Sequence, residues 1–218
     1  MVDFDRARQV MIDNQLRAGG VTETRLLSRM RLVPREIFVP EARRALAYVD
    51  DIHWFGKPGA SRFMPAPATL ARLLHLAEIT AQDAVLDIGA GTGYATAIIA
   101  GLAASVIGLE QDAALAAAAA INLAALDIPN ASVVSGDIVQ FGAERFDVML
   151  AQGTLDNVPD SFIAALKDGG RLVALLQTDA VGTAHVFVKA GGKFTARAEF
   201  DAFLPPLHAK AGHEEFVF

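Results

Sequence analysis

The stretch that most constrains this chain is a short apolar run that leads directly into three alternate glycines. The run, residues 84–88, is typical of a strand buried on both faces. Gly89, Gly91 and Gly93 allow a sharp turn and a close approach of a ligand to the backbone. A helix is expected to begin near Tyr94, with its first amide groups facing that ligand. The segment predicts a nucleotide-sized site, although strand-to-helix turns also use glycine for geometric reasons alone.

Glu110 strengthens this prediction because it closes a second apolar strand about 20 residues past the first glycine, the spacing at which an acidic side chain reaches a ribose. A carboxylate can accept hydrogen bonds from both sugar hydroxyls. The alternative is a solvated glutamate at a strand end. After a third strand come Gly136, Asp137 and Ile138. We expect Asp137 to accept the adenine amino group and Ile138 to lie against the base, whereas the alternative is a plain turn.

Strands and helices alternate from residue 66 onward, and such alternation requires a parallel sheet with helices on both faces. We predict an α/β fold: a Rossmann-like, doubly wound, mostly parallel seven-stranded sheet with helices on both faces, antiparallel C-terminal strands and an N-terminal helical extension. Helices are expected at 66–77, from Tyr94, and at 113–126. Strands are expected at 84–88, 105–109, 131–135, 145–150, 171–176, 184–188, 194–203 and 214–218.

The first part of the chain shows a different pattern. Apolar residues recur at helical spacing over residues 4–17 and 22–30, and the pattern then disappears into a loop rich in glycine and proline at 48–67. Loops of this length in compact domains are usually functional or disordered, so we expect a lid or a substrate loop. We therefore divide the chain into a helical extension with the substrate loop, 1–65, and a ligand-binding domain, 66–218, which together form one compact unit.

Composition excludes several classes of function. The net charge of −6 and the pI near 5.3 argue against a nucleic-acid partner, because phosphate binding needs a clustered basic field. The absence of cysteine excludes disulfides and thiolate metal sites, and the histidines have no neighbours at metal-ligand spacing, so we expect no metal. With neither a secretory leader nor a membrane span in the pattern, we expect a cytoplasmic protein; its oligomeric state is not predicted.

The glycine turn, Glu110 and the turn at Gly136 each follow a strand, and the three strand ends are expected to converge on one crevice. This order along the chain resembles that of the class I S-adenosylmethionine-dependent methyltransferases. The competing assignment is a nicotinamide-dependent oxidoreductase. Its fingerprint usually carries a third small residue where this chain has Tyr94, and usually lies near the start of the domain, whereas the turn here begins only at Gly89.

Over essentially its full length the chain resembles the protein-L-isoaspartate O-methyltransferase family. The most specific segment is Val-Pro-Arg-Glu-Ile-Phe-Val-Pro at 33–40, in which Arg35 and Glu36 are expected to form no more than a surface ion pair. The other matching segments are Tyr48–Asp50, Pro67 with the helix after it, the glycine turn, and the Asp168–Gly170 turn.

This resemblance implies that the chain binds S-adenosylmethionine, releases S-adenosylhomocysteine, and methylates the carboxylate of L-isoaspartyl residues in damaged proteins or peptides. The candidate cofactor residues are Asp87, Gly89, Ala90, Gly91, Tyr94, Glu110, Gln111, Gly136, Asp137 and Ile138. No catalytic residue is assigned, because a carboxylate acceptor is already anionic at neutral pH and needs no general base.

The substrate loop departs from the family. The family places threonine and serine hydroxyls two residues apart at the end of this loop, and the corresponding positions here are Phe63 and Pro65. The candidate residues of the loop are His53, Trp54, Arg62, Phe63, Met64 and Pro65. His53, Lys57 and Arg62 could meet an anionic group, whereas the alternative is a structural His53 with solvated Lys57 and Arg62. The departure leaves open a different acceptor, or a protein of the same fold that binds S-adenosylmethionine without catalysis.

Overall fold

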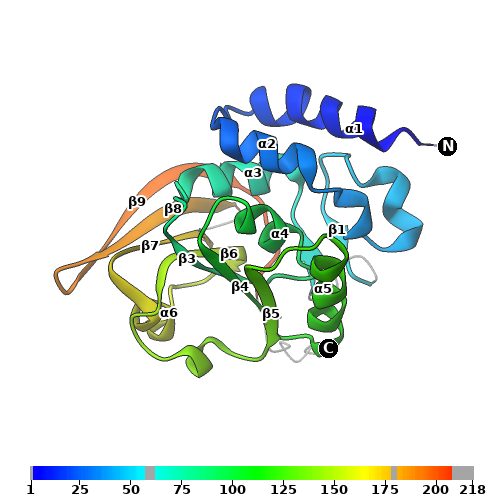
Figure 1. Ribbon diagram of the computed structural model, residues 1–218. Helices are drawn as coiled ribbons and strands as arrows, with labels where there is room; N and C mark the ends of the chain where they lie inside the picture. The colour runs from blue at the N-terminus through cyan, green and yellow to red at the C-terminus, as the bar shows by residue number, and fades with distance from the viewer. Residues whose placement is uncertain (1, 57–61, 178–180, 208–218) are drawn as a thin grey trace, which may run out of the picture.

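The computed structural model describes residues 2–56, 62–177 and 181–207, and its centre is a seven-stranded sheet of order β5-β4-β3-β6-β7-β8-β9 (Figure 1). Strands β3 to β7 pair in parallel, and β8 and β9 pair antiparallel, as the sequence predicts. The strands are β3 (Ala84–Ile88), β4 (Ser105–Glu110), β5 (Ala131–Ser135), β6 (Phe146–Leu155), β7 (Leu166–Gln177), β8 (Gly182–Ala190) and β9 (Lys193–Ala202).

Helices cover both faces of this sheet because its central strands are apolar on both sides. Val85 and Leu150 point into the core beneath α3 (Pro67–Leu76) and α4 (Tyr94–Ala100), to which α5 (Ala113–Ala125) contributes Leu123. Leu86 and Met149 point into a second core beneath the short 3-10 helix η4 (Ile138–Phe141) and α6 (Asp160–Ala165). The sequence analysis did not predict η4 or α6.

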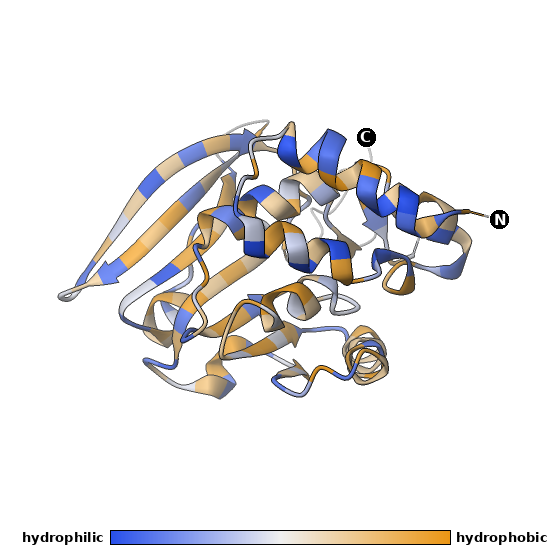
Figure 2. Cartoon of the chain, turned by 45° about the horizontal axis from the view of Figure 1, so that its top comes forward, coloured by the Kyte–Doolittle hydropathy of each residue, from blue (hydrophilic) through white to orange (hydrophobic). Residues whose placement is uncertain are grey.

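The N-terminal helices form a further layer on the side of α3 and α4, with hydrophilic residues along their outer sides (Figures 1 and 2). The predicted helix at 4–17 is continuous, but its second half winds as a π-helix. The second predicted helix is confirmed near its expected bounds, and two 3-10 helices follow it. These elements are α1 (Phe4–Met11), η1 (Ile12–Arg17), α2 (Thr24–Leu32), η2 (Arg35–Ile37) and η3 (Glu41–Leu46).

The segment expected to be one long loop contains a small antiparallel ladder. Strand β1 (His53–Trp54) pairs with β2 (Phe63–Met64), so that Trp54 lies opposite Phe63. Lys57 and the predicted strand at 214–218 lie outside the described residues. The division of the chain at residue 65 stays a prediction.

The order of the strands reverses between β3 and β6, which are neighbours in the sheet although β4 and β5 come between them in the sequence. Open α/β sheets bind ligands outside the carboxyl ends of their strands at such a switch point. The carboxyl ends of β3, β4 and β6 therefore define where a ligand site is expected.

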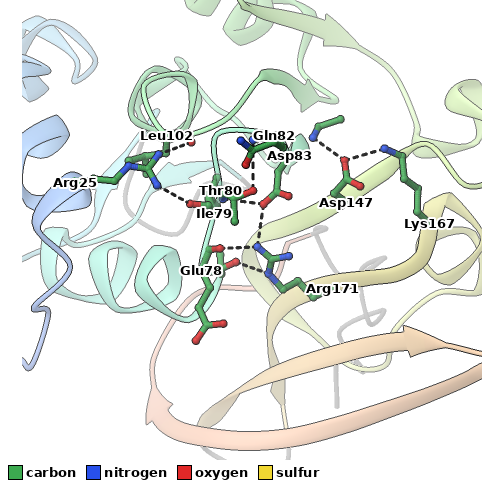
Figure 3. A network of polar contacts seen from close by, with 12 residues as sticks. Arg25, Glu78, Ile79, Thr80, Gln82, Asp83, Leu102, Asp147, Lys167 and Arg171 are labelled. Atoms are coloured by element: carbon green, nitrogen blue, oxygen red, sulfur yellow. Dashed lines mark hydrogen bonds and ion pairs between the residues drawn. The ribbon is translucent and has the colours of Figure 1, made fainter.

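A polar network fixes the connection that leads from α3 into β3 (Figure 3). Arg171 of β7 donates to Asp83 Oδ2 at 3.0 Å and to the carbonyl oxygen of Glu78 at 2.7 Å. Arg25 of α2 donates to the carbonyl oxygen of Ile79 at 3.3 Å. Two elements far apart in the sequence, α2 and β7, thus hold this connection directly before β3.

We predict that Arg171→Met lowers the free energy of unfolding by about 2–3 kcal/mol, because it leaves the buried Asp83 carboxylate without its cation. The control is Lys167→Met in the same region: Lys167 and Asp147 are 40% and 31% exposed, so loss of their pair should cost less than about 1 kcal/mol. Urea denaturation measures both. Equal losses would contradict the role given to Arg171.

Candidate functional site

The glycine turn has the geometry that its sequence predicts. Gly89, Gly91 and Gly93 have φ values of +83°, +56° and +93°, which side chains rarely adopt. The Gly89 amide donates to the carbonyl oxygen of Leu109 at 2.8 Å, which ties the turn to β4. Helix α4 begins at Tyr94, as predicted.

Glu110, the last residue of β4, is fully buried beside this turn, so the alternative of a solvated glutamate is wrong. Its Oε2 atom accepts hydrogen bonds from the Gly91 amide at 2.7 Å and from Arg62 Nη2 at 2.5 Å. Its Oε1 atom accepts from the Asp112 amide at 3.1 Å. The carboxylate is thus held at the carboxyl end of the sheet by two backbone donors and one guanidinium.

The space directly over the glycines holds side chains of the protein itself. A methyl group added to Gly89 would lie 2.7 Å from Leu207 Cδ1 and 3.1 Å from Arg62 Nη2. One added to Gly91 would lie 2.7 Å from the Phe55 ring. The close approach to the turn that we expected of a ligand is therefore made here by Arg62, Leu207 and Phe55.

Leu207 reaches this position because a late segment of the chain docks on β6. The Thr154 amide donates to the carbonyl oxygen of Pro205, and the Leu207 amide donates to that of Thr154, both at 2.9 Å. The segment lies so close to Gly153 that a methyl group there would come within 2.6 Å of Leu207 Cα. A glycine in β6 thus allows residues from far along the sequence to form a wall of the site.

A pocket of about 140 Å³ remains next to the turn, at the carboxyl ends of β3, β4 and β5. Leu109 and Phe162 give it apolar walls, and Arg62 also lines it. Five predicted cofactor residues line it, namely Gly89, Gln111, Gly136, Asp137 and Ile138. Pockets that bury a ligand of drug size measure about 300–1,000 Å³, so this space suits one ring system such as a purine base.

The other five predicted cofactor residues, Asp87, Ala90, Gly91, Tyr94 and Glu110, do not line the pocket. The Tyr94 ring lies in the core, 5.4 Å from the Phe38 ring centroid and 4.8 Å from the Arg35 guanidinium. Direct contact of Tyr94 with a cofactor is therefore not supported by its position.

Asp87 lies buried beneath the turn. It accepts hydrogen bonds from Thr96 Oγ1 at 2.6 Å and from Gln152 Nε2 at 2.5 Å. Burial raises the pKa of Asp87 to about 6, because the loss of solvation outweighs these two hydrogen bonds, which act in the opposite direction. Asp87 therefore links β3 to Thr96 of α4 and to Gln152 of β6 beneath the turn.

The predicted substrate loop faces inward more than expected. His53, Phe63 and Met64 are all buried, and the Trp54 ring packs edge-on against Phe63 with their centroids 5.6 Å apart. Burial, and then the nearby Arg35 cation, lower the pKa of His53 to about 4, so that His53 is uncharged at neutral pH. His53 thus offers no positive charge to an anion, in agreement with the alternative of a structural histidine.

Arg35 is the polar residue whose role sequence reasoning misjudged. It is fully buried, and it donates from Nη2 to the carbonyl oxygen of Pro65 at 2.6 Å and from Nε to that of Ala47 at 2.8 Å. The expected surface ion pair is wrong, because Glu36 pairs instead with Arg8 at 3.2 Å. The only sequence signal was the position of an arginine between apolar residues and prolines.

Two expected absences concern metals and membranes. Within 2–56, 62–177 and 181–207, no three His, Asp or Glu side chains are grouped so that they could hold a metal ion. In the same ranges no helix combines the length and the apolarity that crossing a membrane requires.

Comparison with known proteins points to one family. A family model described as protein-L-isoaspartate(D-aspartate) O-methyltransferase matches residues 6–211. A protein-L-isoaspartate O-methyltransferase of Koribacter versatilis (strain Ellin345) is 36% identical over 96% of this chain and 93% of its own length. One of Methanoregula boonei is 32% identical over 95% of both chains.

Solved structures show the same fold. A protein-L-isoaspartate O-methyltransferase superposes with a TM-score of 0.76 at 21% identity, over 91% of this chain and 65% of that one. A proposed member from Plasmodium falciparum was solved in complex with S-adenosyl-L-homocysteine. It superposes with a TM-score of 0.75 at 19% identity, over 95% of this chain and 99% of that one. At these identities the likeness concerns the fold alone.

The raised pKa of Asp87 predicts a pH-dependent stability. The pKa of Asp87 is higher in the folded protein, about 6, than its ordinary value of 3.8, so the protonated carboxyl stabilises the fold. This contribution is complete below pH 3.8 and is lost as the pH rises through about 6. Asp87→Asn has no such loss, so its stability relative to the wild type should increase between pH 4 and pH 7. Urea titrations at several pH values measure this difference. A difference that stays constant with pH would contradict it.

Proposed function

Because the chain belongs to the protein-L-isoaspartate(D-aspartate) O-methyltransferase family, we propose that it transfers the methyl group of S-adenosylmethionine to the carboxylate of L-isoaspartyl residues in damaged proteins or peptides. The match to the family covers residues 6–211 and so includes the substrate loop and the sheet. The observation that carries the proposal is the buried Glu110 carboxylate, which ends its strand beside a glycine turn and a purine-sized pocket.

The residues present fit the nucleoside part of this cofactor. Glu110 accepts the ribose hydroxyls, and such charge-assisted hydrogen bonds contribute about 1.5–3 kcal/mol each where water is excluded. The adenine occupies the pocket, where Leu109, Ile138 and Phe162 offer apolar contacts and Asp137 accepts from the amino group. The Asp137 side chain also accepts from the Val139 amide at 3.1 Å, which fixes its orientation.

The bound cofactor supplies an electrophilic methyl group on a sulfonium. The ionised acceptor carboxylate would take up this methyl group, with S-adenosylhomocysteine as the leaving group. The chain contributes by placing the two reactants in line and by excluding water, and such placement can contribute about 7–11 kcal/mol to catalysis. No residue needs to remove a proton, so none is assigned as a general base.

The setting of the enzyme follows from its chemistry and charge. A peptide or a damaged protein is the partner, and nucleic acid is not, because the net charge is −6. The chain contains no cysteine, which suits a reducing compartment, and we place the enzyme in the cytoplasm.

We predict that the wild-type protein binds S-adenosylhomocysteine and does not bind NAD in isothermal titration calorimetry. With labelled S-adenosylmethionine it should form a base-labile methyl ester on an isoaspartyl peptide and none on the aspartyl peptide of the same sequence. Binding of S-adenosylhomocysteine without ester formation would show a protein of the same fold with another acceptor or without catalysis. Binding of NAD alone would contradict the cofactor assignment.

We further predict that Glu110→Gln weakens S-adenosylhomocysteine binding about tenfold or more, because an amide has one acceptor oxygen and no charge for the two ribose hydroxyls. The matched control is Glu144→Gln at an exposed position, which should leave the affinity unchanged. Calorimetry measures both dissociation constants. Equal affinities in the two variants would exclude Glu110 as the ribose-binding residue.

A further inference from the structure

Arg62 is the positively charged group that compensates the buried Glu110 carboxylate. The Glu110 side chain is 0% exposed and that of Arg62 is 12% exposed, with 2.5 Å between Arg62 Nη2 and Glu110 Oε2. Arg62 also donates from Nη1 to the carbonyl oxygen of Leu207 at 3.0 Å. A buried carboxylate without a partner is costly, so the free protein needs this guanidinium in place.

The proposed cofactor needs the same oxygen atoms. The ribose must approach Glu110 over the glycine turn, where Arg62 Nη2 lies only 3.1 Å from the position of a methyl group on Gly89. Glu110 does not line the pocket, and its side chain is 0% exposed while Arg62 covers it. The cofactor can therefore reach Glu110 only when Arg62 leaves it.

Once released, the guanidinium is free to bind another anion, and the proposed acceptor is one. Among the described residues that line the pocket, Arg62 alone carries a positive charge. It directly precedes Phe63, in the segment where Phe63 and Pro65 offer no hydroxyl to a carboxylate. Its planar guanidinium can bind a carboxylate through two parallel hydrogen bonds, which a lysine cannot do.

We propose that Arg62 exchanges carboxylate partners: it neutralises Glu110 in the free protein, and it binds the carboxylate of the acceptor after the ribose has replaced it on Glu110. This inference rests on the proposed function and adds a residue that determines specificity for the acceptor. It also sets an order of binding, because the acceptor site is completed only when the cofactor is present. Release of Arg62 also frees its contact with Leu207, which lies over Gly89.

The first experiment measures S-adenosylhomocysteine binding by calorimetry in the wild type, Arg62→Gln and Arg62→Lys. Arg62→Gln removes the competitor, so its dissociation constant should be about tenfold lower than that of the wild type. Arg62→Lys keeps the charge and should bind with an affinity close to that of the wild type. The matched control is Arg44→Gln, an exposed arginine on η3 that should have no effect.

A spectroscopic signal accompanies the same titration. Trp54 is the only tryptophan of the chain, and it pairs with Phe63, the residue after Arg62. Its fluorescence should therefore change when S-adenosylhomocysteine displaces Arg62 in the wild type. The change should be smaller in Arg62→Gln, where there is no ion pair to open.

The second experiment measures peptide binding to the complex with S-adenosylhomocysteine, so that it does not depend on methyl transfer. An isoaspartyl peptide is compared with the peptide in which its free carboxylate is a carboxamide. The wild-type complex should prefer the carboxylate about tenfold, and Arg62→Gln should lose this preference. Arg62→Lys should retain part of it, because it keeps the charge without the two parallel hydrogen bonds.

If Arg62 had only a structural role, Arg62→Gln would bind both the cofactor product and the peptide more weakly. The exchange predicts instead that Arg62→Gln binds S-adenosylhomocysteine more tightly and loses its preference for the carboxylate peptide. Unchanged or weaker cofactor binding in Arg62→Gln would overturn the proposal, as would an unaltered preference for the carboxylate peptide. If the wild type methylates isoaspartyl peptide and either result occurs, the proposed function stands and only the exchange fails. A wild type that does not bind S-adenosylhomocysteine would instead overturn the proposed function.

Discussion

The site depends on one carboxylate held at the end of a parallel strand. Glu110 accepts from the amides of Gly91 and Asp112 and from Arg62, so a single buried charge links the glycine turn, the start of α5 and the substrate loop. Removing such a charge from water is costly, and each of its donors offsets part of that cost. Two donors belong to the backbone and are fixed by the fold, whereas the third lies on a long side chain.

Two arginines hold the ladder of β1 and β2 in different ways. Arg35 is fully buried and anchors Pro65, directly after β2, through a backbone carbonyl oxygen. Arg62, directly before β2, is anchored to a carboxylate at the ligand site itself. In the proposed exchange the ladder stays fixed through Arg35, and only the end next to the pocket changes its partner. This asymmetry lets the loop respond to a ligand without losing its place on the core.

The sequence was sufficient for those features that local patterns encode. The turn at 89–93, the start of α4 at Tyr94 and the five parallel strands follow from apolar runs and glycine spacing, and the position of Glu110 follows from its distance along the chain. Contacts between distant residues were not predictable in this way. The pair of Arg62 and Glu110 joins positions 48 residues apart, and the neutral state of His53 results from burial that no short pattern reveals.

The docking of Leu207 on β6 gives the pocket a wall whose backbone is held by residues outside the nucleotide-binding motif. Its backbone is held by two hydrogen bonds with Thr154 and by one from Arg62, it fits because Gly153 has no side chain, and its own side chain packs over Gly89. Substitutions in the middle of β6 can therefore reshape the ligand site while the nucleotide-binding motif stays intact. Two relatives with the same motif can differ in the ligands they admit for this reason alone.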